Sequence, residues 1–186
     1  MCLLQFNFHQ LVVEYDLLDF IIEQLLPAAA DDDIVLQVIT VIGTILSDED
    51  CADQVARSGI VQNLMELLAA RQEDDEMVLQ IVFVFYKLLF YESSRKIIMS
   101  HPKTITYLID LMYDKNAEIK RVCNGALTIV MQFDEEWAVK IRDRRFEVRR
   151  PFHQIRVSSL QVLSRVPLFF SSAPCFGHLL PGGCLR

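Results

Sequence analysis

Cysteine is scarce in this sequence, and the short patterns that give cysteine a chemical role are absent. Five cysteines are scattered over 186 residues, an odd number with no C-x-x-C pair among them. Disulfide frameworks and structural zinc sites both use regular cysteine spacings, so we expect neither, and a reducing compartment is favoured. The four histidines lie far apart, and we interpret His101, beside Pro102, as a helix-terminating residue rather than a ligand.

Catalytic motifs are also missing. The sequence contains no G-x-S-x-G, no H-E-x-x-H, no phosphate-binding P-loop and no G-x-G-x-x-G. Because no nucleophile is paired with a base, we predict that the protein is not an enzyme. We expect no cofactor and no metal ion.

Targeting and membrane-spanning segments are lacking as well. A signal peptide needs a basic start and an apolar core, but Met1–Val13 holds no Lys or Arg, and Glu14 and Asp16 follow it. The most apolar stretch, Glu76–Tyr91, is shorter than the roughly 20 residues that cross a bilayer. We therefore expect a soluble, cytoplasmic protein with no membrane insertion.

Acidic residues are absent from the C-terminal end. Residues 1–147 hold 13 Lys and Arg against 25 Asp and Glu, a net charge of −12, whereas residues 148–186 hold five Arg and no acid. An acidic body is a poor partner for phosphate, so we expect no nucleic-acid partner. The last part also holds four of the six prolines. We predict that residues 147–186 form a basic, disordered tail.

What the sequence does contain is helical periodicity with a long repeat. Glu76–Tyr91 is apolar nearly all round, so a helix there must be enclosed by neighbours. A similar stretch lies upstream, Asp33–Leu46, and another lies downstream, Glu118–Gln132. Alignment of the three stretches superposes Ile42, Phe85 and Ala126, at offsets of 43 and 41 residues. Self-similarity at this period indicates a repeat array.

Apolar spacing predicts ten helices, separated by polar turns. They are expected over residues 9–15, 17–26, 34–46, 51–57, 60–68, 76–91, 93–99, 107–112, 118–132 and 137–145. Acidic clusters at residues 31–33, 48–50, 73–76 and 134–136 are interpreted as helix caps. A second interpretation is an edge of negative potential that attracts a basic peptide. Gly59 is expected to end a short helix in the left-handed conformation.

Units of a short, a medium and a long helix resemble armadillo repeats. The motif that carries this resemblance is Gly59, Ile60, Leu64, Leu67, Leu68, Asp74, Asp75 and the run from Phe85 to Leu89. The fold that we predict is therefore all-α, a right-handed α-solenoid of about three armadillo repeats over residues 9–146. Because a solenoid needs polar caps at both ends, we expect the isolated chain to self-associate.

A closer resemblance is carried by the strings PAAADDDIVLQV, AARQEDDEMVLQIVFVFYKLLF, YLIDLMYDKNAEIKRVC and FDEEWAVKI. These are similar to the C-terminal armadillo repeats of the kinesin-associated protein family, the non-motor accessory subunits of heterotrimeric kinesin-II. The likeness covers residues 9–146, and we expect it to stop at Phe146. It implies that further repeats precede this part, so we expect a fragment or an alternative product.

The resemblance implies a non-enzymatic adaptor. It would bind kinesin-II motor subunit tails and cargo proteins in microtubule-based and intraflagellar transport, in the cytoplasm, on microtubules and in the cilium. The alternative is a general armadillo scaffold whose acidic groove binds basic peptides in signalling or adhesion. Added salt separates the two, because it weakens an electrostatic groove.

The predicted partner site is the concave groove of the long helices. Armadillo proteins of nuclear import place Trp and Asn there, but the Asn positions here hold Ile45, Leu88 and Ile129. We therefore expect apolar contacts rather than recognition of a nuclear-localisation peptide. The predicted groove residues are Gln37, Val41, Thr44, Gln80, Val84, Lys87, Arg121, Gly125 and Thr128. Cys123 and Trp137 are interpreted as packing residues.

Overall fold

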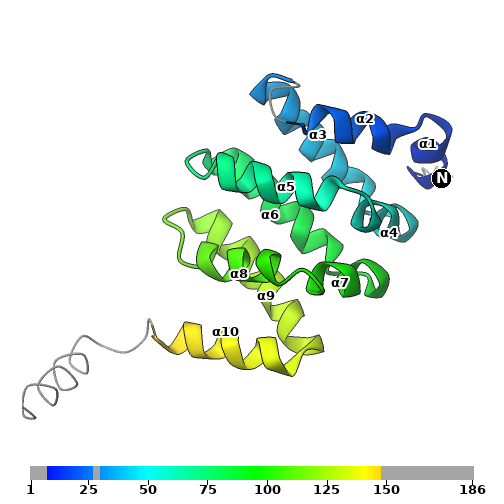
Figure 1. Cartoon of the computed structure of the whole chain (residues 1–186). Coiled ribbons are helices and arrows are strands. Elements are labelled where there is room, and N and C mark those ends of the chain that lie inside the picture. Colours follow the sequence, from blue (N-terminus) through cyan, green and yellow to red (C-terminus); the bar gives the residue numbers. More distant parts are fainter. Residues whose placement is uncertain (1–7, 27–29, 148–186) are drawn as a thin grey trace, which may run out of the picture. The chain divides into compact units, whose positions relative to one another are not determined.

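The computed structural model describes residues 8–26 and 30–147, and all the regular structure in these ranges is helical (Figure 1). The helices are α1 (Phe8–Glu14), α2 (Leu17–Gln24), α3 (Asp32–Ile45), α4 (Glu49–Arg57), α5 (Ile60–Ala70), α6 (Asp75–Leu88), α7 (Glu92–Met99), α8 (Pro102–Leu111), α9 (Ala117–Phe133) and α10 (Glu135–Glu147). The ten helices occur where the sequence predicts them, except that α8 begins at Pro102 rather than Tyr107, because proline suits the first turn of a helix. The architecture is compatible with an α-solenoid. The predicted tail, from residue 148 onward, lies outside the described residues.

Acidic and amide side chains begin several of the helices. The carboxylate of Asp48 accepts hydrogen bonds from the N–H groups of Asp50 and Cys51, at 3.0 and 3.3 Å. Asp74 does the same at the start of α6 and Asn116 at the start of α9. These bonds satisfy N–H groups that a helix leaves without a partner. The capping interpretation is thus confirmed at these turns, whereas Asp31 makes no such bond at α3.

The break between α4 and α5 differs from the prediction. Gly59 has φ −70° and ψ −5°, a right-handed conformation that any residue adopts. The chain turns instead at Ser58, whose backbone is extended. The Ser58 hydroxyl donates to the carbonyl of Val55 at 2.8 Å and accepts from the N–H of Ile60 at 3.2 Å. One hydroxyl therefore ends α4 and begins α5, and the glycine is not needed for its conformation.

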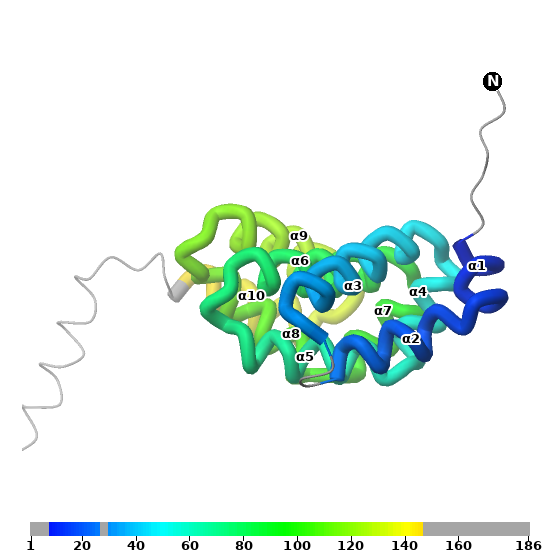
Figure 2. The backbone as a smooth tube through the Cα atoms, turned by 90° about the horizontal axis from the view of Figure 1, so that it is seen from above, coloured from blue at the N-terminus to red at the C-terminus, as the bar shows by residue number. Residues whose placement is uncertain are grey.

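The three long helices lie in succession, with α6 in the middle (Figure 2). Helix α6 contacts α3 on one side and α9 on the other, while α5 and α8 pack on α6 and α9. Helix α10 covers the far side of α9. Each long helix is thus held by elements about 40 residues away in the sequence. The order explains why half of the residues of α6, the central long helix, are buried.

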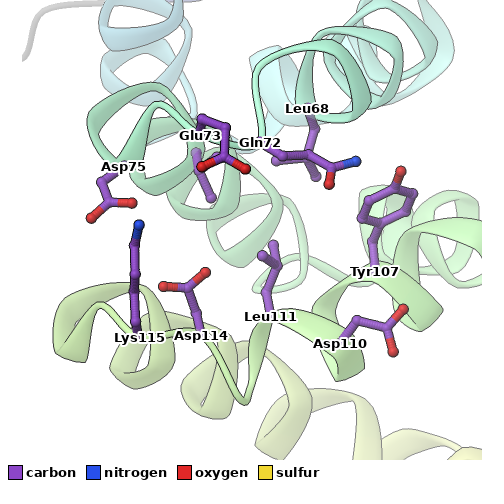
Figure 3. Close-up of a pocket in the computed structure, with 10 residues that line it drawn as sticks. Leu68, Gln72, Glu73, Asp75, Tyr107, Asp110, Leu111, Asp114 and Lys115 are labelled. Atoms are coloured by element: carbon purple, nitrogen blue, oxygen red, sulfur yellow. The ribbon is translucent and has the colours of Figure 1, made fainter.

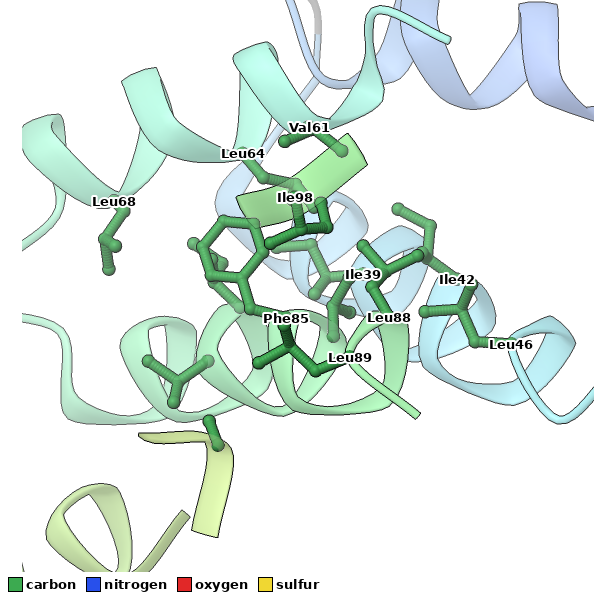
Figure 4. Packing of buried hydrophobic residues seen from close by; sticks show 14 of the residues in the cluster. Ile39, Ile42, Leu46, Val61, Leu64, Leu68, Phe85, Leu88, Leu89 and Ile98 are labelled. Atoms are coloured by element: carbon green, nitrogen blue, oxygen red, sulfur yellow. The ribbon is translucent and has the colours of Figure 1, made fainter. Parts of the chain in front are cut away.

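Phe85 lies at the middle of the core. Its side chain is fully buried, and Leu64 of α5 and Ile98 of α7 gather around it together with Leu88 (Figure 4). Seven of the 14 residues of α6 are buried, namely Met77, Val78, Ile81, Val82, Val84, Phe85 and Leu88. Burial of one such side chain contributes about 1.5 to 3 kcal/mol. The expectation that this helix is enclosed by its neighbours is therefore confirmed.

Two buried polar residues of α7 close the C-terminal end of α6. The hydroxyl of Ser94 donates to the carbonyl of Leu88 at 2.6 Å. The guanidinium of Arg95 donates to the carbonyls of Leu89 and Phe90 at 3.0 and 2.9 Å. A guanidinium has several donors, so it can serve carbonyls that the helix leaves unpaired. These two side chains are buried because their hydrogen bonds are satisfied.

No single helix in the described part of the chain is both long and apolar enough to cross a membrane. Helices α6 and α7 pass that test only as a pair, and the chain bends by 120° between them.

Candidate interaction surface

The exposed stripes of α3, α6 and α9 form one surface, which we call the long-helix face. It consists of Gln37, Thr40 and Thr44 on α3, Gln80, Phe83 and Lys87 on α6, and Arg121, Asn124 and Thr128 on α9. All nine side chains are exposed or half-buried. Contacts of α6 with α3 and α9 place the three stripes next to one another.

The groove residues predicted from the sequence lie on these helices, with one correction. Val84 is fully buried and cannot meet a partner in the folded chain. Val41, which aligns with it on α3, is 43% exposed. The difference arises because α6 lies between two long helices, whereas within the described residues no long helix precedes α3. The other predicted residues are accessible, and their role in binding remains a prediction.

Several polar side chains of the long-helix face are bonded to their own helices. Thr44 donates to the carbonyl of Thr40 at 3.0 Å, and Thr128 donates to that of Asn124 at 2.7 Å. The Asn124 amide in turn donates to Lys120, at 2.9 Å. Such bonds to the residue four positions earlier occupy a donor that a ligand could otherwise use. These polar side chains of the long-helix face therefore already make hydrogen bonds within their own helices.

Three aromatic side chains of α6 and its C-terminal end form a ridge, which sequence reasoning did not assign to the site. Phe83, Tyr86 and Phe90 are spaced so that they lie on one side of a helix. Phe83 is 36% exposed and Phe90 is 52% exposed. The Tyr86 ring lies 6.3 Å from that of Phe83 and 4.9 Å from that of Phe90, centroid to centroid. The sequence signal that could have identified these three residues is their helical spacing within the apolar run.

Two glycines of the neighbouring helices make room for this ridge. A Cβ atom added at Gly43 of α3 would meet the ring of Phe83 at 3.7 Å. One added at Gly125 of α9 would meet the ring of Tyr86 at 3.3 Å, which is tighter than almost all real contacts. Gly125 was predicted as a groove residue, and the structure gives it a packing role beside the ridge.

Lys87 is the cation of the ridge. Its Nζ atom donates to the hydroxyl of Ser47 at 2.9 Å and lies 5.7 Å from the centroid of Phe83. The phenol of Tyr91 donates to the carbonyl of Ser47, also at 2.9 Å. Lys87 makes no ion pair with any described residue. It therefore presents its charge beside the aromatic rings without a carboxylate to neutralise it.

A second surface lies at the turns that precede α6 and α9. It is a pocket of about 500 Å³ where four carboxylates, from Glu73, Asp75, Asp110 and Asp114, accompany one ammonium, that of Lys115 (Figure 3). Asp75 also accepts a hydrogen bond from the amide of Asn116 at 3.1 Å. The excess of negative charge makes this pocket suitable for a basic group.

A third surface is a pocket of about 550 Å³ between α5 and α8. Its lining is mixed, with Val61 and Met65 on α5 and Tyr107 on α8 beside polar side chains. His101 lies at its edge, where the residue precedes the Pro102 that begins α8. This position agrees with the interpretation of His101 as a residue at a helix boundary.

The cysteines of the described part are packing residues. Cys51 and Cys123 are both fully buried. Burial raises the pKa of Cys123 to about 12, with a smaller contribution from the nearby carboxylate of Asp114. Burial likewise raises the pKa of Cys51 to about 11. Trp137 is half-buried against the core, and the ammonium of Lys140 lies 4.6 Å from its ring centroid.

Comparison with known protein families gives a match to most of the chain. The family model described as kinesin-associated protein (KAP) matches residues 1–164 of the 186. The match continues 18 residues beyond Phe146, which corrects the expectation that the likeness stops there. It also spans α1 to α10, the whole of the described fold. The chain therefore belongs to the kinesin-associated protein family.

Proposed function

We propose that this chain is a non-enzymatic adaptor, part of the accessory subunit that links kinesin-II motor tails to cargo. The observation that carries this proposal is the family match over 164 of 186 residues. The described surfaces agree with it, because they offer an aromatic ridge and an acidic pocket to a partner. The motor would hydrolyse the nucleotide, and this chain would provide the binding surface for motor tails and cargo.

We also propose that the helices form about three armadillo repeats in a right-handed solenoid. Support comes from burial at equivalent positions, since the offsets of 43 and 41 residues superpose buried positions on all three long helices. The equivalent buried sets are Val35, Val78 and Ile119; Val38, Ile81 and Val122; Ile39, Val82 and Cys123; Ile42, Phe85 and Ala126; and Leu46, Leu89 and Val130. Equivalent packing at a fixed period is typical of a repeat array.

Capture of motor tails tests the adaptor proposal. The full chain, immobilised on beads, should retain purified kinesin-II motor tails, whereas an unrelated armadillo protein of similar charge should not. Retention should survive moderate salt if apolar contacts of the long-helix face dominate. Retention no greater than that of the control protein would contradict the proposal.

The proposed place of action is the cytoplasm, on microtubules and in the cilium, where intraflagellar transport takes place. The family match supports this only through the kinesin connection. A fluorescent fusion of the full chain, expressed in ciliated cells, should enrich along the cilium in a manner that depends on the motor. Uniform fluorescence in the presence of the motor would argue against this localisation.

A second candidate function is a scaffold that binds basic peptides, and the acidic pocket favours it. Four carboxylates around one ammonium would hold a Lys or Arg side chain more tightly than a neutral one. A short Arg-containing peptide should then bind the full chain, and the affinity should fall steeply with added salt. Double replacement of Asp110 and Asp114 by Asn should abolish that binding. Binding that neither added salt nor the replacements reduce would show that this pocket is not the peptide-binding site.

A further inference from the structure

The aromatic ridge of α6 has the composition and position of a protein-binding surface. Phe83, Tyr86 and Phe90 span eight residues, from the last part of α6 into the turn that follows it. Aromatic residues carry much of the binding energy in protein interfaces, and two of these rings are more than one-third exposed. Tyr86, between them, is half-buried and packs against the core.

The ridge is also held in place before any partner arrives. The glycines at positions 43 and 125 let the rings of Phe83 and Tyr86 lie against the backbones of α3 and α9. Tyr86 and Phe90 pack edge to face, with ring planes at 70°. Side chains that are already ordered lose less entropy on binding, so a ridge seated in this way binds at lower cost.

The polar residues beside the ridge favour a particular backbone conformation in the ligand. An extended peptide exposes N–H and C=O groups, which must find partners when a surface excludes water from them. The side-chain donors at Thr40, Thr44, Asn124 and Thr128 are already given to carbonyls of their own helices. A helical ligand brings its backbone hydrogen bonds with it and needs no such donors.

The charge beside the ridge is positive, although the chain as a whole is acidic. Among the residues that the structure describes, the partners of the Lys87 ammonium are the neutral Ser47 hydroxyl and the Phe83 ring. Asp48 follows Ser47 in the chain, and its carboxylate already accepts from two backbone N–H groups. Arg121 of α9 is already paired with Glu118, at 2.6 Å. A carboxylate on the ligand would therefore find an unpaired ammonium at Lys87.

We infer that the ridge docks an amphipathic helix of a partner protein, with the helix's apolar stripe on the rings of Phe83, Tyr86 and Phe90 and a flanking carboxylate at Lys87. This inference rests on the proposed adaptor function and names the chemical class of segment that the adaptor takes. It is distinct from the basic-peptide scaffold, because the two surfaces select opposite charges.

Synthetic peptides test the inference on the full chain. The probe is a fluorescent peptide of about 18 residues, five helical turns, with Leu at positions i, i+3, i+4 and i+7 and Glu on both flanks of that stripe. A second peptide carries Lys in place of Glu, and a third keeps the Glu but has two central prolines that prevent a helix. Fluorescence anisotropy should show binding of the first peptide and binding at least about tenfold weaker for the other two.

Variants of the chain locate the contact. Phe90→Ser should weaken binding of the acidic helical peptide by about tenfold or more, because it removes an exposed ring and leaves the core unchanged. Lys87→Glu should reverse the preference, so that the Lys-bearing peptide becomes the better ligand. Lys103→Glu, the same charge change at an exposed position of α8, is the matched control and should leave the preference unchanged. Circular dichroism spectra that superpose on the wild type show that each variant is folded.

Three outcomes would overturn the inference: no binding of the acidic helix, equal binding of the proline peptide, or a preference that Lys87→Glu leaves unchanged. These results are separable from those for the adaptor proposal. Equal retention of motor tails by the wild type and by Phe90→Ser would support the adaptor proposal and show that the ridge is not the binding site for the motor tails. Binding of the acidic helical peptide without retention of motor tails would support the ridge as a helix-binding surface and contradict the proposed binding of the motor.

Discussion

Phe85 and Lys87 lie two positions apart on α6 and occupy opposite environments. Phe85 is fully buried in the core, whereas Lys87 is half-buried on the long-helix face. Truncation of a buried Phe to Ala costs about 3 to 5 kcal/mol, and a buried carboxylate costs more because it loses its hydration. Domains are stabilised by only about 5 to 15 kcal/mol, so the position of a residue on the helix decides its effect.

We therefore predict that Phe85→Asp unfolds the helical array, whereas Lys87→Ala changes the free energy of unfolding by about 0.5 kcal/mol or less. Far-UV circular dichroism and urea denaturation of both variants check this. A cooperative transition for Phe85→Asp near the wild-type midpoint would contradict the packing described here. Because Lys87→Ala remains folded, it can report on binding.

The two buried thiols give a prediction about pH. Burial raises the pKa of Cys123 from 9.0 to about 12 and that of Cys51 from 9.0 to about 11. A raised pKa means that the folded state holds the proton more tightly than the unfolded state. Stability is therefore fully present below pH 9 and is lost as the pH rises through 9 towards 11 and 12.

The same shift predicts low reactivity. At about pH 8 the native thiolate fraction of Cys123 is on the order of one in ten thousand, and access is blocked as well. Iodoacetamide should leave the tryptic peptides of Cys51 and Cys123 unmodified in the native chain and modify both in urea, as measured by mass spectrometry. Rapid modification of either thiol under native conditions would show that its surroundings open locally.

At the scale of the element, the turns decide where the helices begin. Asp74 accepts two backbone hydrogen bonds at the start of α6, whereas Asp31 at the start of α3 accepts none. Both residues are aspartates within acidic clusters, so the sequence does not distinguish them. The distinction depends on the backbone conformation of each turn, because a cap needs its carboxylate oxygen within reach of the N–H groups two and three residues later.

This difference predicts unequal effects of the same substitution. Asp74→Ala should lower the free energy of unfolding by about 1 kcal/mol, through the lost cap. Asp31→Ala should lower it by a few tenths of a kcal/mol, the effect of a charge near a helix N-terminus. Urea denaturation of the two variants gives both values in one series. Equal losses would mean that the capping bonds of Asp74 add nothing to stability.

Helix positions were predictable from the sequence because they depend on local signals. Apolar spacing and acidic turns act within a few residues, and the predicted helices match the observed ones closely except at α8, which begins at Pro102 rather than Tyr107. The buried polar residues Ser94 and Arg95 were not predictable. Their burial depends on the carbonyls at the C-terminal end of α6, which the chain places beside them only after α6 and α7 have packed.

At the scale of the whole molecule, α3 leaves an apolar stripe without a neighbour among the described residues. Ile34 and Val41 are 48% and 43% exposed. The equivalent positions of α6 are Met77 and Val84, which are 1% and 0% exposed. The difference follows from the order of packing, because α3 lies against α6 on one side and no described long helix lies against its other side. Exposed apolar surface of this kind promotes association.

We therefore predict that the isolated chain self-associates through α3. Light scattering should give a mass above that of the monomer at micromolar concentration. Val41→Asp should reduce the association, whereas Val139→Asp, at a valine of α10 that is 47% exposed, should leave it unchanged. A monomeric mass for the wild type would count against the prediction, and an equal effect of both substitutions would place the contact elsewhere.

The sequence by itself determined the helices, the 43- and 41-residue offsets and the family resemblance, because each depends on residue identity and spacing along the chain. The tertiary structure alone decided which face of each long helix meets solvent. Val41 and Val84 occupy equivalent places in the repeat, yet one is exposed and the other buried, because a helix about 40 residues away covers only the second. The aromatic ridge is a product of the same packing. Its rings lie beside α3 and α9, where Gly43 faces Phe83 and Gly125 faces Tyr86.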